Sequence, residues 1–120
     1  MTECIYIYNS KSHDLVCQGH ASEEGEDKSV CAAITVLVHT LAFNVEESAE
    51  MCAEKEIKVE PGYYHIKVKP IDGAEEQMEF LFGAFLNGLY MLSEDPKLKE
   101  RITLKVIWDE KSTDDSDSEI

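Results

Sequence analysis

The chain has 120 residues, which suits a single domain and leaves no room for two independent hydrophobic cores. Its 25 acidic residues outnumber its 11 basic residues, giving a formal net charge of −14, and a hydrophobic fraction of 43% argues against disorder of the whole chain. A surface of this charge repels phosphate backbones and anionic lipids. We therefore expect no direct nucleic-acid or membrane partner, whereas a basic partner would be attracted.

Part of the negative charge is concentrated towards the C-terminus. Residues 109–120 contain six acidic residues and one lysine, without hydrophobic periodicity. This composition is typical of a disordered segment, so we predict one folded domain over residues 1–108 and an acidic, disordered tail over residues 109–120. No apolar run approaches the ~18 residues that span a bilayer, and the N-terminus lacks the pattern of a signal peptide. These features predict a cytoplasmic protein.

The first 20 residues have the pattern of a β-hairpin. Residues 4–8 are rich in β-branched and aromatic side chains, residues 9–12 favour a turn, and residues 15–17 are apolar again. The pattern predicts two strands, of which the second ends at Gly19, and it places His13 in the turn between them.

The segment from residue 30 to residue 43 is apolar on nearly every side. Because a surface helix would carry a polar face, this composition predicts a helix that lies across a sheet or in a subunit interface. We expect Ser29 to be its N-cap and Asn44 to end it. Its richest apolar face consists of Val30, Ile34, Leu37, Val38 and Leu41.

A second hairpin is predicted over residues 56–60 and 63–69, with Tyr64, Ile66 and Val68 facing the core. The helix that follows Asp72 and Gly73 has apolar residues at the i, i+3, i+4, i+7 spacing of one buried face. These residues are Met78, Leu81, Phe82, Phe85, Leu86, Leu89 and Leu92.

A last strand is predicted over residues 103–108, with Leu104, Val106 and Trp108 pointing inward. The expected order of elements is therefore ββαββαβ. This order predicts a two-layer α+β fold, in which a largely antiparallel sheet of about five strands carries two helices on one face.

The residues best suited to catalysis are His20, at the end of a predicted strand, and Cys31, in the first turn of a predicted helix. The unpaired N–H groups at a helix N-terminus stabilise a thiolate, which is the nucleophilic form of cysteine. An imidazole nearby can accept the thiol proton, and the same N–H groups can bind an oxyanion. The pattern therefore suggests nucleophilic catalysis.

Structural readings of the same residues stay open at this point. Cys31 can be a small buried thiol, and His20 a polar residue at a strand end. A zinc site formed by Cys17, His20 and Cys31 can be drawn, but these spacings match no familiar structural-zinc pattern. The acidic residues between 23 and 27 lack the ligand order of an EF-hand, which favours a solvated charged loop. The four cysteines show no disulfide framework, so reduced thiols are expected.

Around these residues the chain resembles the ribosomal-processing cysteine protease family. The matching motifs are Gly19-His20-Ala21 and Val30-Cys31-Ala32-Ala33, separated by a loop that contains Gly25 and Asp27. The resemblance covers about residues 3–108, and further matches are Phe43-Asn44, Gly62-Tyr63-Tyr64-His65 and Gly83. The chain departs from the family at Lys28, where an aspartate normally stands, and at Thr35, where a serine is usual.

The resemblance implies a cysteine endopeptidase with a Cys-His dyad and a thioester intermediate. Cys31 would be the nucleophile and His20 the general base, with Asp27 and Ser29 as supporting residues. The implied substrate is the N-terminal extension of a large-subunit ribosomal protein, and ribosomal proteins are usually basic. The resemblance also implies a homodimer, and it implies neither a metal nor a cofactor.

Two other functions fit the same residues. The chain can be a binding module that holds a basic ribosomal or other partner without cutting it. The acidic tail would favour this function, and so would the aspartate at position 27, one residue before the place where the family has it. It can also be a mobile-element protease whose client is a capsid or scaffold protein.

Overall fold

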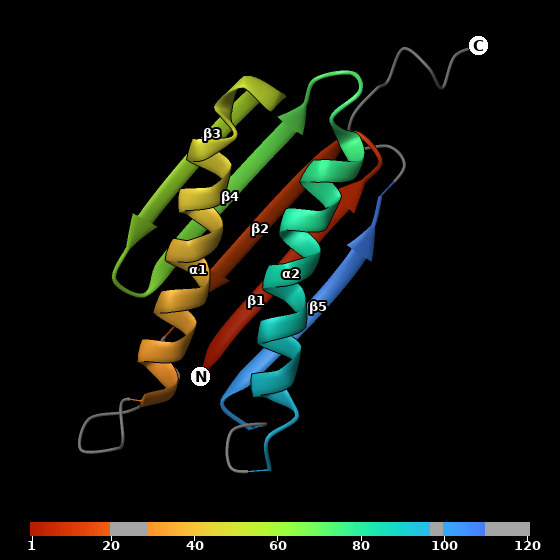
Figure 1. Ribbon diagram of the computed structural model, residues 1–120. Helices are drawn as coiled ribbons and strands as arrows, with labels where there is room; N and C mark the ends of the chain where they lie inside the picture. Colours follow the sequence, from red (N-terminus) through yellow and green to blue (C-terminus); the bar gives the residue numbers. More distant parts are fainter. Residues whose placement is uncertain (20–28, 97–99, 110–120) are drawn as a thin grey trace.

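The computed structural model describes residues 1–19, 29–96 and 100–109 (Figure 1). The order of elements is ββαββαβ, as predicted, with one short 3-10 helix, η1, after the first α-helix. The elements are β1 (Thr2–Asn9), β2 (Ser12–Gln18), α1 (Ser29–Glu47), η1 (Ala49–Met51), β3 (Cys52–Glu60), β4 (Tyr63–Pro70), α2 (Glu75–Ser93) and β5 (Ile102–Trp108).

The five strands form one mixed sheet in the order β3-β4-β2-β1-β5. All neighbouring strands are antiparallel except β1 and β5, which run parallel. Figure 1 shows both helices on the same face of this sheet, so the predicted two-layer α+β fold is confirmed. Neither α1 nor α2 combines the length and apolar character that crossing a membrane requires.

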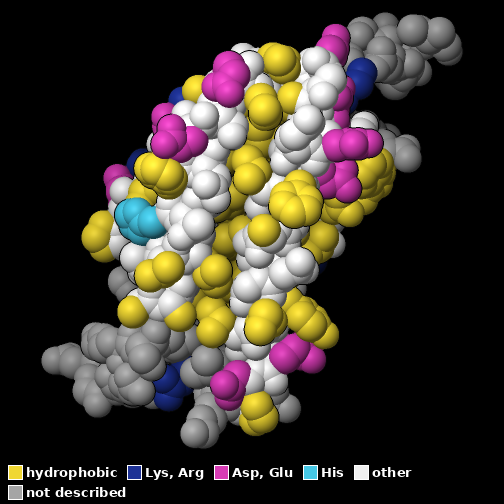
Figure 2. Space-filling model, in the orientation of Figure 1, with side chains coloured by type: hydrophobic (Ala, Val, Ile, Leu, Met, Phe, Trp, Pro, Cys, Tyr) yellow, Lys and Arg dark blue, Asp and Glu magenta, His cyan; other side chains and the backbone are white. Residues whose placement is uncertain are grey.

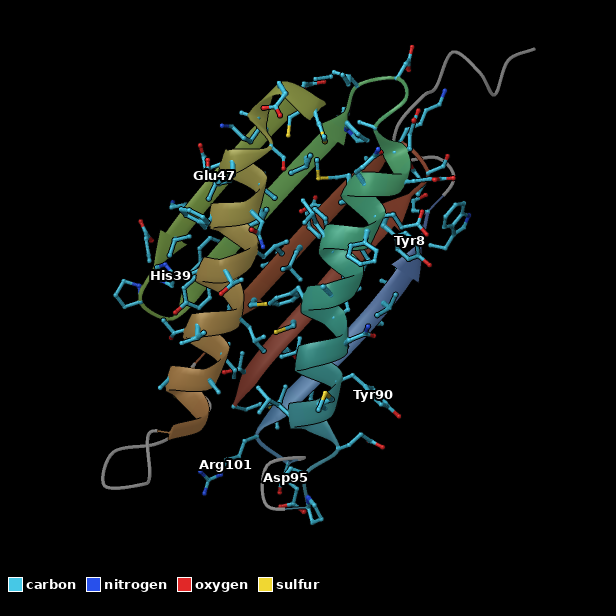
Figure 3. The ribbon with its side chains drawn as sticks, viewed as in Figure 1. Tyr8, His39, Glu47, Tyr90, Asp95 and Arg101 are labelled. Carbon is cyan, nitrogen blue, oxygen red and sulfur yellow. The ribbon has the colours of Figure 1, made fainter. Side chains whose placement is uncertain are left out.

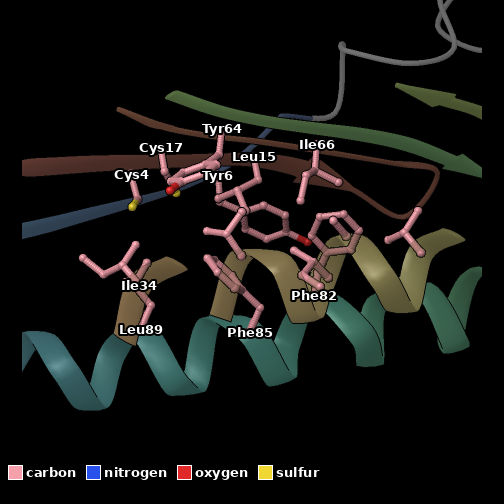
Figure 4. Close-up of a cluster of buried hydrophobic side chains, with 14 of the residues drawn as sticks. Cys4, Tyr6, Leu15, Cys17, Ile34, Tyr64, Ile66, Phe82, Phe85 and Leu89 are labelled. Atoms are coloured by element: carbon pink, nitrogen blue, oxygen red, sulfur yellow. The ribbon is translucent and has the colours of Figure 1, made fainter. Parts of the chain in front are cut away.

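The core lies between the helices and the inner face of the sheet (Figure 4). Alternation along β4 buries Tyr64, Ile66 and Val68, as expected from a strand with one face covered. The apolar face predicted for α2 is also confirmed. Its four most buried side chains are Met78, Phe82, Phe85 and Leu89. Burial of each such side chain stabilises the fold by roughly 1.5–3 kcal/mol.

The predicted ends of the first helix were wrong by a few residues. The helix continues through Asn44 to Glu47, because Val45 extends the apolar spacing of Val38 and Leu41 and is fully buried. At the other end, Ser29 is the first helical residue rather than the N-cap.

The prediction that β5 points Leu104, Val106 and Trp108 inward was only partly correct. These residues do pair with inward-facing residues of β1, but Val106 and Trp108 remain 49% and 52% exposed. Because β5 is an edge strand, α2 does not fully cover it. The fully buried residue of β5 is Ile102, which lies before the predicted start of the strand.

Candidate active site

Cys31 lies in the first turn of α1, as the third residue of the helix. Its side chain is partly buried and packs against the hydrophobic core. The first four N–H groups of an α-helix have no partner within the helix, and they carry the positive end of its dipole. A thiolate at this position would therefore be stabilised by its own helix.

The end of β2, directly before His20, is held by several backbone contacts. The Gly19 N–H donates a hydrogen bond to the Gly62 carbonyl oxygen at 2.9 Å, and the Thr2 hydroxyl donates to the Gly19 carbonyl oxygen at 3.4 Å. Gly19 has φ +97°, and a Cβ added there would lie 2.2 Å from the Met1 carbonyl oxygen. Only glycine fits this position without displacing the N-terminus.

Tyr64 connects the end of β2 with the first half of α1. On the sheet it pairs directly with Cys17, two residues before Gly19. Its hydroxyl oxygen lies 3.2 Å from the Thr35 hydroxyl oxygen, which is one helical turn beyond Cys31. The hydrogen bond fixes the start of α1 over the same part of the sheet from which the chain continues to His20.

His20 and Asp27 lie outside the described residues, as do the acidic residues of the loop between them. Ser29 is part of the backbone of α1, but its side chain is likewise not described. The structure thus positions Cys31 and the residue before His20. The pairing of Cys31 with His20, and the supporting roles of Asp27 and Ser29, remain predictions.

The other three cysteines have the environments of structural thiols. Cys4 and Cys17 lie opposite each other on β1 and β2, and both are fully buried. A side-chain hydrogen bond with Cys4 and burial both favour the neutral thiol of Cys17 and raise its pKa, so a thiolate is disfavoured there. Burial also raises the pKa of Cys52, whose thiol donates to the Ser48 carbonyl oxygen at 3.6 Å. None of these environments activates a nucleophile.

The other histidines also have structural partners, and one prediction about them was wrong. His13 lies in β2 rather than in a turn, 1% exposed, with its ring stacked 4.7 Å from that of Phe82. Its Nδ1 is hydrogen-bonded to the Tyr6 hydroxyl. His65 pairs with Asp14 at 2.7 Å on the uncovered face of the sheet. His39 is exposed on α1 (Figure 3). Its ring makes a T-shaped contact with that of Tyr64, with the ring centroids 6.3 Å apart.

The described part of the chain contains no group of three or more His, Cys, Asp or Glu side chains that could hold a metal ion. The zinc alternative also needs His20, which lies outside this part. The described geometry therefore offers a helix-terminal thiol, and no metal centre can be built from it.

Sequence reasoning did not single out Gly19 or Tyr64 as residues that position the site. The spacing of the strands correctly predicted that Tyr64 points inward, but nothing in a single sequence says which helix residue its hydroxyl meets. For Gly19, the signal was a glycine directly before the candidate histidine, which is compatible with a positive φ.

A sequence model of the family described as "Cysteine protease Prp" matches residues 1–100 of this chain. The chain belongs to this family. A search of curated proteins found no match. Membership of the Prp family makes the chain a cysteine protease. The role of Cys31 as its nucleophile stays a prediction.

Solved structures show that the fold is shared. SMU.848 from Streptococcus mutans is 28% identical, with a TM-score of 0.64 over 91% of this chain and 96% of that chain. The ribosomal processing protease Prp from S. aureus, in complex with a covalently linked product peptide, is 18% identical, with a TM-score of 0.66 over 88% and 99% of the two chains. The same protease in complex with a substrate peptide gives a TM-score of 0.62 at 18% identity and equal coverage.

Proposed function

We propose that this Prp-family protein is a cytoplasmic cysteine endopeptidase that removes the N-terminal extension of a large-subunit ribosomal protein. The observation that carries the proposal is the position of Cys31 in the first turn of α1, within a chain that matches the Prp family over residues 1–100. The Prp of S. aureus, whose structures contain a substrate or product peptide, supports the ribosomal client.

In the proposed mechanism, His20 accepts the proton of the Cys31 thiol, and the thiolate attacks the carbonyl carbon of the scissile bond. The N–H groups of the first turn of α1 stabilise the resulting oxyanion. The C–N bond then breaks, the leaving amine takes the proton from His20, and a thioester to Cys31 remains. Water, deprotonated by His20, hydrolyses the thioester and restores the thiol. Asp27 and Ser29 are proposed as supporting residues, and no cofactor takes part.

We further propose that the protein forms a homodimer through the outer face of α1. Val36 and Phe43 are both 63% exposed on this helix, although large apolar side chains usually avoid water. Light scattering should therefore give twice the chain mass for the parent protein and a single chain mass for Phe43→Glu. A parent protein that remains monomeric at high concentration would contradict the proposal.

The proposed peptidase activity is tested by intact-mass analysis after mixing the protein with an extension-bearing ribosomal protein. We expect one cut by the parent protein and none by Cys31→Ala or His20→Ala. Cys52→Ala serves as a matched control, because it removes a partly buried thiol far from the site and should leave the cut unchanged. Undiminished cleavage by Cys31→Ser would refute the proposed nucleophile.

Absence of any cut would favour a binding module or a different client, such as a capsid or scaffold protein. The pH dependence of Cys31 alkylation distinguishes these two outcomes. Alkylation well below pH ~8.5 indicates a stabilised thiolate and hence an active protease without its correct client. Alkylation that rises only near pH ~8.5 indicates an ordinary thiol and hence a binding role.

A further inference from the structure

A surface cleft lies at the end of the molecule opposite Cys31, between the C-terminal end of α1 and the N-terminal end of α2. It has a volume of about 500 Å³ and is lined by Ser48, Met51, Glu76, Gln77, Phe80 and Leu81. Phe80 is 75% exposed. Glu47 lies sixteen positions beyond Cys31 on α1, a distance of about 24 Å at 1.5 Å per residue. The cleft is therefore separate from the candidate active site.

The two segments that border the cleft carry only negative charge. Residues 44–51 and 71–81 contain seven acidic residues and no lysine or arginine. Figure 2 shows acidic side chains at this end of both helices with hydrophobic side chains between them, and Figure 3 shows Glu47 at the end of α1. Two of the seven carboxylates have partners: Glu46 pairs with Lys55, and Glu75 accepts from the Gly73 N–H.

The other five acidic residues make no ion pair with any residue in the described parts of the chain. They are Glu47, Glu50, Asp72, Glu76 and Glu79. The last turn of α1 also contains no basic residue, so the negative end of its dipole adds to the same potential. Another hollow of the surface, on β3 and β4, differs because both lysines and glutamates line it.

We propose that this cleft binds a basic segment of a partner protein, with a large apolar side chain of the partner against Met51, Phe80 and Leu81. Lysine or arginine residues on either side of that apolar side chain would pair with the unpaired carboxylates. Exposed ion pairs contribute little to the free energy of binding. Most of the affinity would therefore come from burial of apolar surface against Met51, Phe80 and Leu81. A volume near 500 Å³ is within the range of pockets that bind ligands.

The negative charge around the cleft argues against three other occupants, namely a second copy of the chain, nucleic acid and anionic lipid. A second copy of the chain would bring two sets of unpaired carboxylates together, and like charges in an interface oppose association. Nucleic acid and anionic lipid would be repelled for the same reason. The proposal does not depend on peptidase activity, since it concerns a surface remote from Cys31 and is tested by binding alone.

The test uses the full chain and a fluorescent 12-residue peptide in which lysines flank a central Phe-Leu pair. We expect saturable binding that weakens with salt and is lost when Phe-Leu is replaced by Ser-Ser. Two substitutions in the cleft, Glu76→Lys and Phe80→Ser, should each weaken binding roughly tenfold, as expected for a residue at the centre of an interface.

Matched controls separate the cleft from general surface effects. Glu56→Lys makes the same charge change on an exposed residue of β3, and Met91→Ser removes a 73% exposed side chain near the other end of α2. Both should change the affinity less than twofold. The proposal is overturned if Glu56→Lys weakens binding as much as Glu76→Lys, if the Ser-Ser peptide binds equally well, or if no saturable binding occurs.

Discussion

His13 is a titratable side chain enclosed by aromatic rings. Burial lowers its pKa from 6.5 to about 4, and its Nε2 has no hydrogen-bond partner in the described parts of the chain. Tyr6 and Phe82 stack with the imidazole, and burial also raises the pKa of the Tyr6 hydroxyl. The imidazole is therefore neutral in the folded protein at neutral pH.

This burial makes the stability of the fold sensitive to acid. Above about pH 6.5 both folded and unfolded chains carry neutral His13, and as the pH falls the unfolded chain takes up a proton first. Between pH 7 and pH 5 the free energy of unfolding should fall by about 2 kcal/mol on account of His13 alone. Urea unfolding at the two pH values measures this loss. The double variant Tyr6→Phe/His13→Phe removes both hydrogen-bond partners. Its free energy of unfolding should therefore fall by about 2 kcal/mol less between pH 7 and pH 5 than that of the parent protein. An unchanged pH dependence in the variant would show that His13 is not responsible.

Gly19 and Gly73 provide a second test at the scale of single residues. Their φ angles are +97° and +94°, but a Cβ would collide with the Met1 carbonyl oxygen only at Gly19 and meets nothing within 4 Å at Gly73. Gly73→Ala should lower the free energy of unfolding by about 1–2 kcal/mol, which is the cost of the left-handed conformation. Gly19→Ala should cost clearly more. Equal losses in the two urea unfolding curves would mean that the N-terminus moves aside freely.

At the scale of elements, two glycines of α2 show how closely the helices approach each other. A Cβ at Gly83 would meet nothing within 4 Å, whereas one at Gly88 would lie 2.7 Å from the Leu37 Cδ2 atom of α1. Gly83→Ala should therefore stabilise the protein by about 0.5–1 kcal/mol through helix propensity. Gly88→Ala should stabilise the protein less than Gly83→Ala, or destabilise it, because the Leu37 side chain must shift to admit the new methyl group. Thermal unfolding of the two variants and the parent measures the difference, and equal gains would contradict a tight contact.

The elements themselves could largely be predicted from the sequence, because each has a clear hydrophobic period. The stripe of α2 and the alternation of β4 are patterns of the residues alone. The end of α1 depends on whether Val45 meets the sheet, and the exposure of Trp108 depends on β5 being an edge strand. Both are properties of the assembled layers, which a local pattern does not contain.

The candidate site could be predicted less completely. The motifs around His20 and Cys31 indicated the family, and the placement of Cys31 at a helix start followed from the apolar run after it. The contact between Tyr64 and Thr35 could not be foreseen, since it joins residues 29 positions apart and requires the angle at which α1 crosses the sheet.

For the whole molecule, a net charge of −14 opposes compaction, because like charges repel more strongly in the folded state. Raising the NaCl concentration from 20 to 200 mM should screen this repulsion and raise the melting temperature by about 4 °C, equivalent to roughly 1 kcal/mol. Calorimetry or circular dichroism measures the shift. The variant Glu3→Lys/Glu56→Lys changes two exposed residues and reduces the net charge to −10, since each substitution adds two charges. Its salt response should be smaller, and an equal response would point to ion binding instead.

The parallel pairing of β1 with β5 sets the order in which the sheet can be completed. β1 is the first strand along the chain, yet its second neighbour is β5, the last strand, and the Thr2 N–H bonds to the Arg101 carbonyl oxygen at 2.8 Å. During synthesis on the ribosome, β1 therefore has one unpaired edge until almost the whole chain has emerged. An emerging chain with an open strand edge is prone to pair with its neighbours on the same messenger RNA. Synonymous codons that slow translation shortly before residue 102 would prolong this exposure.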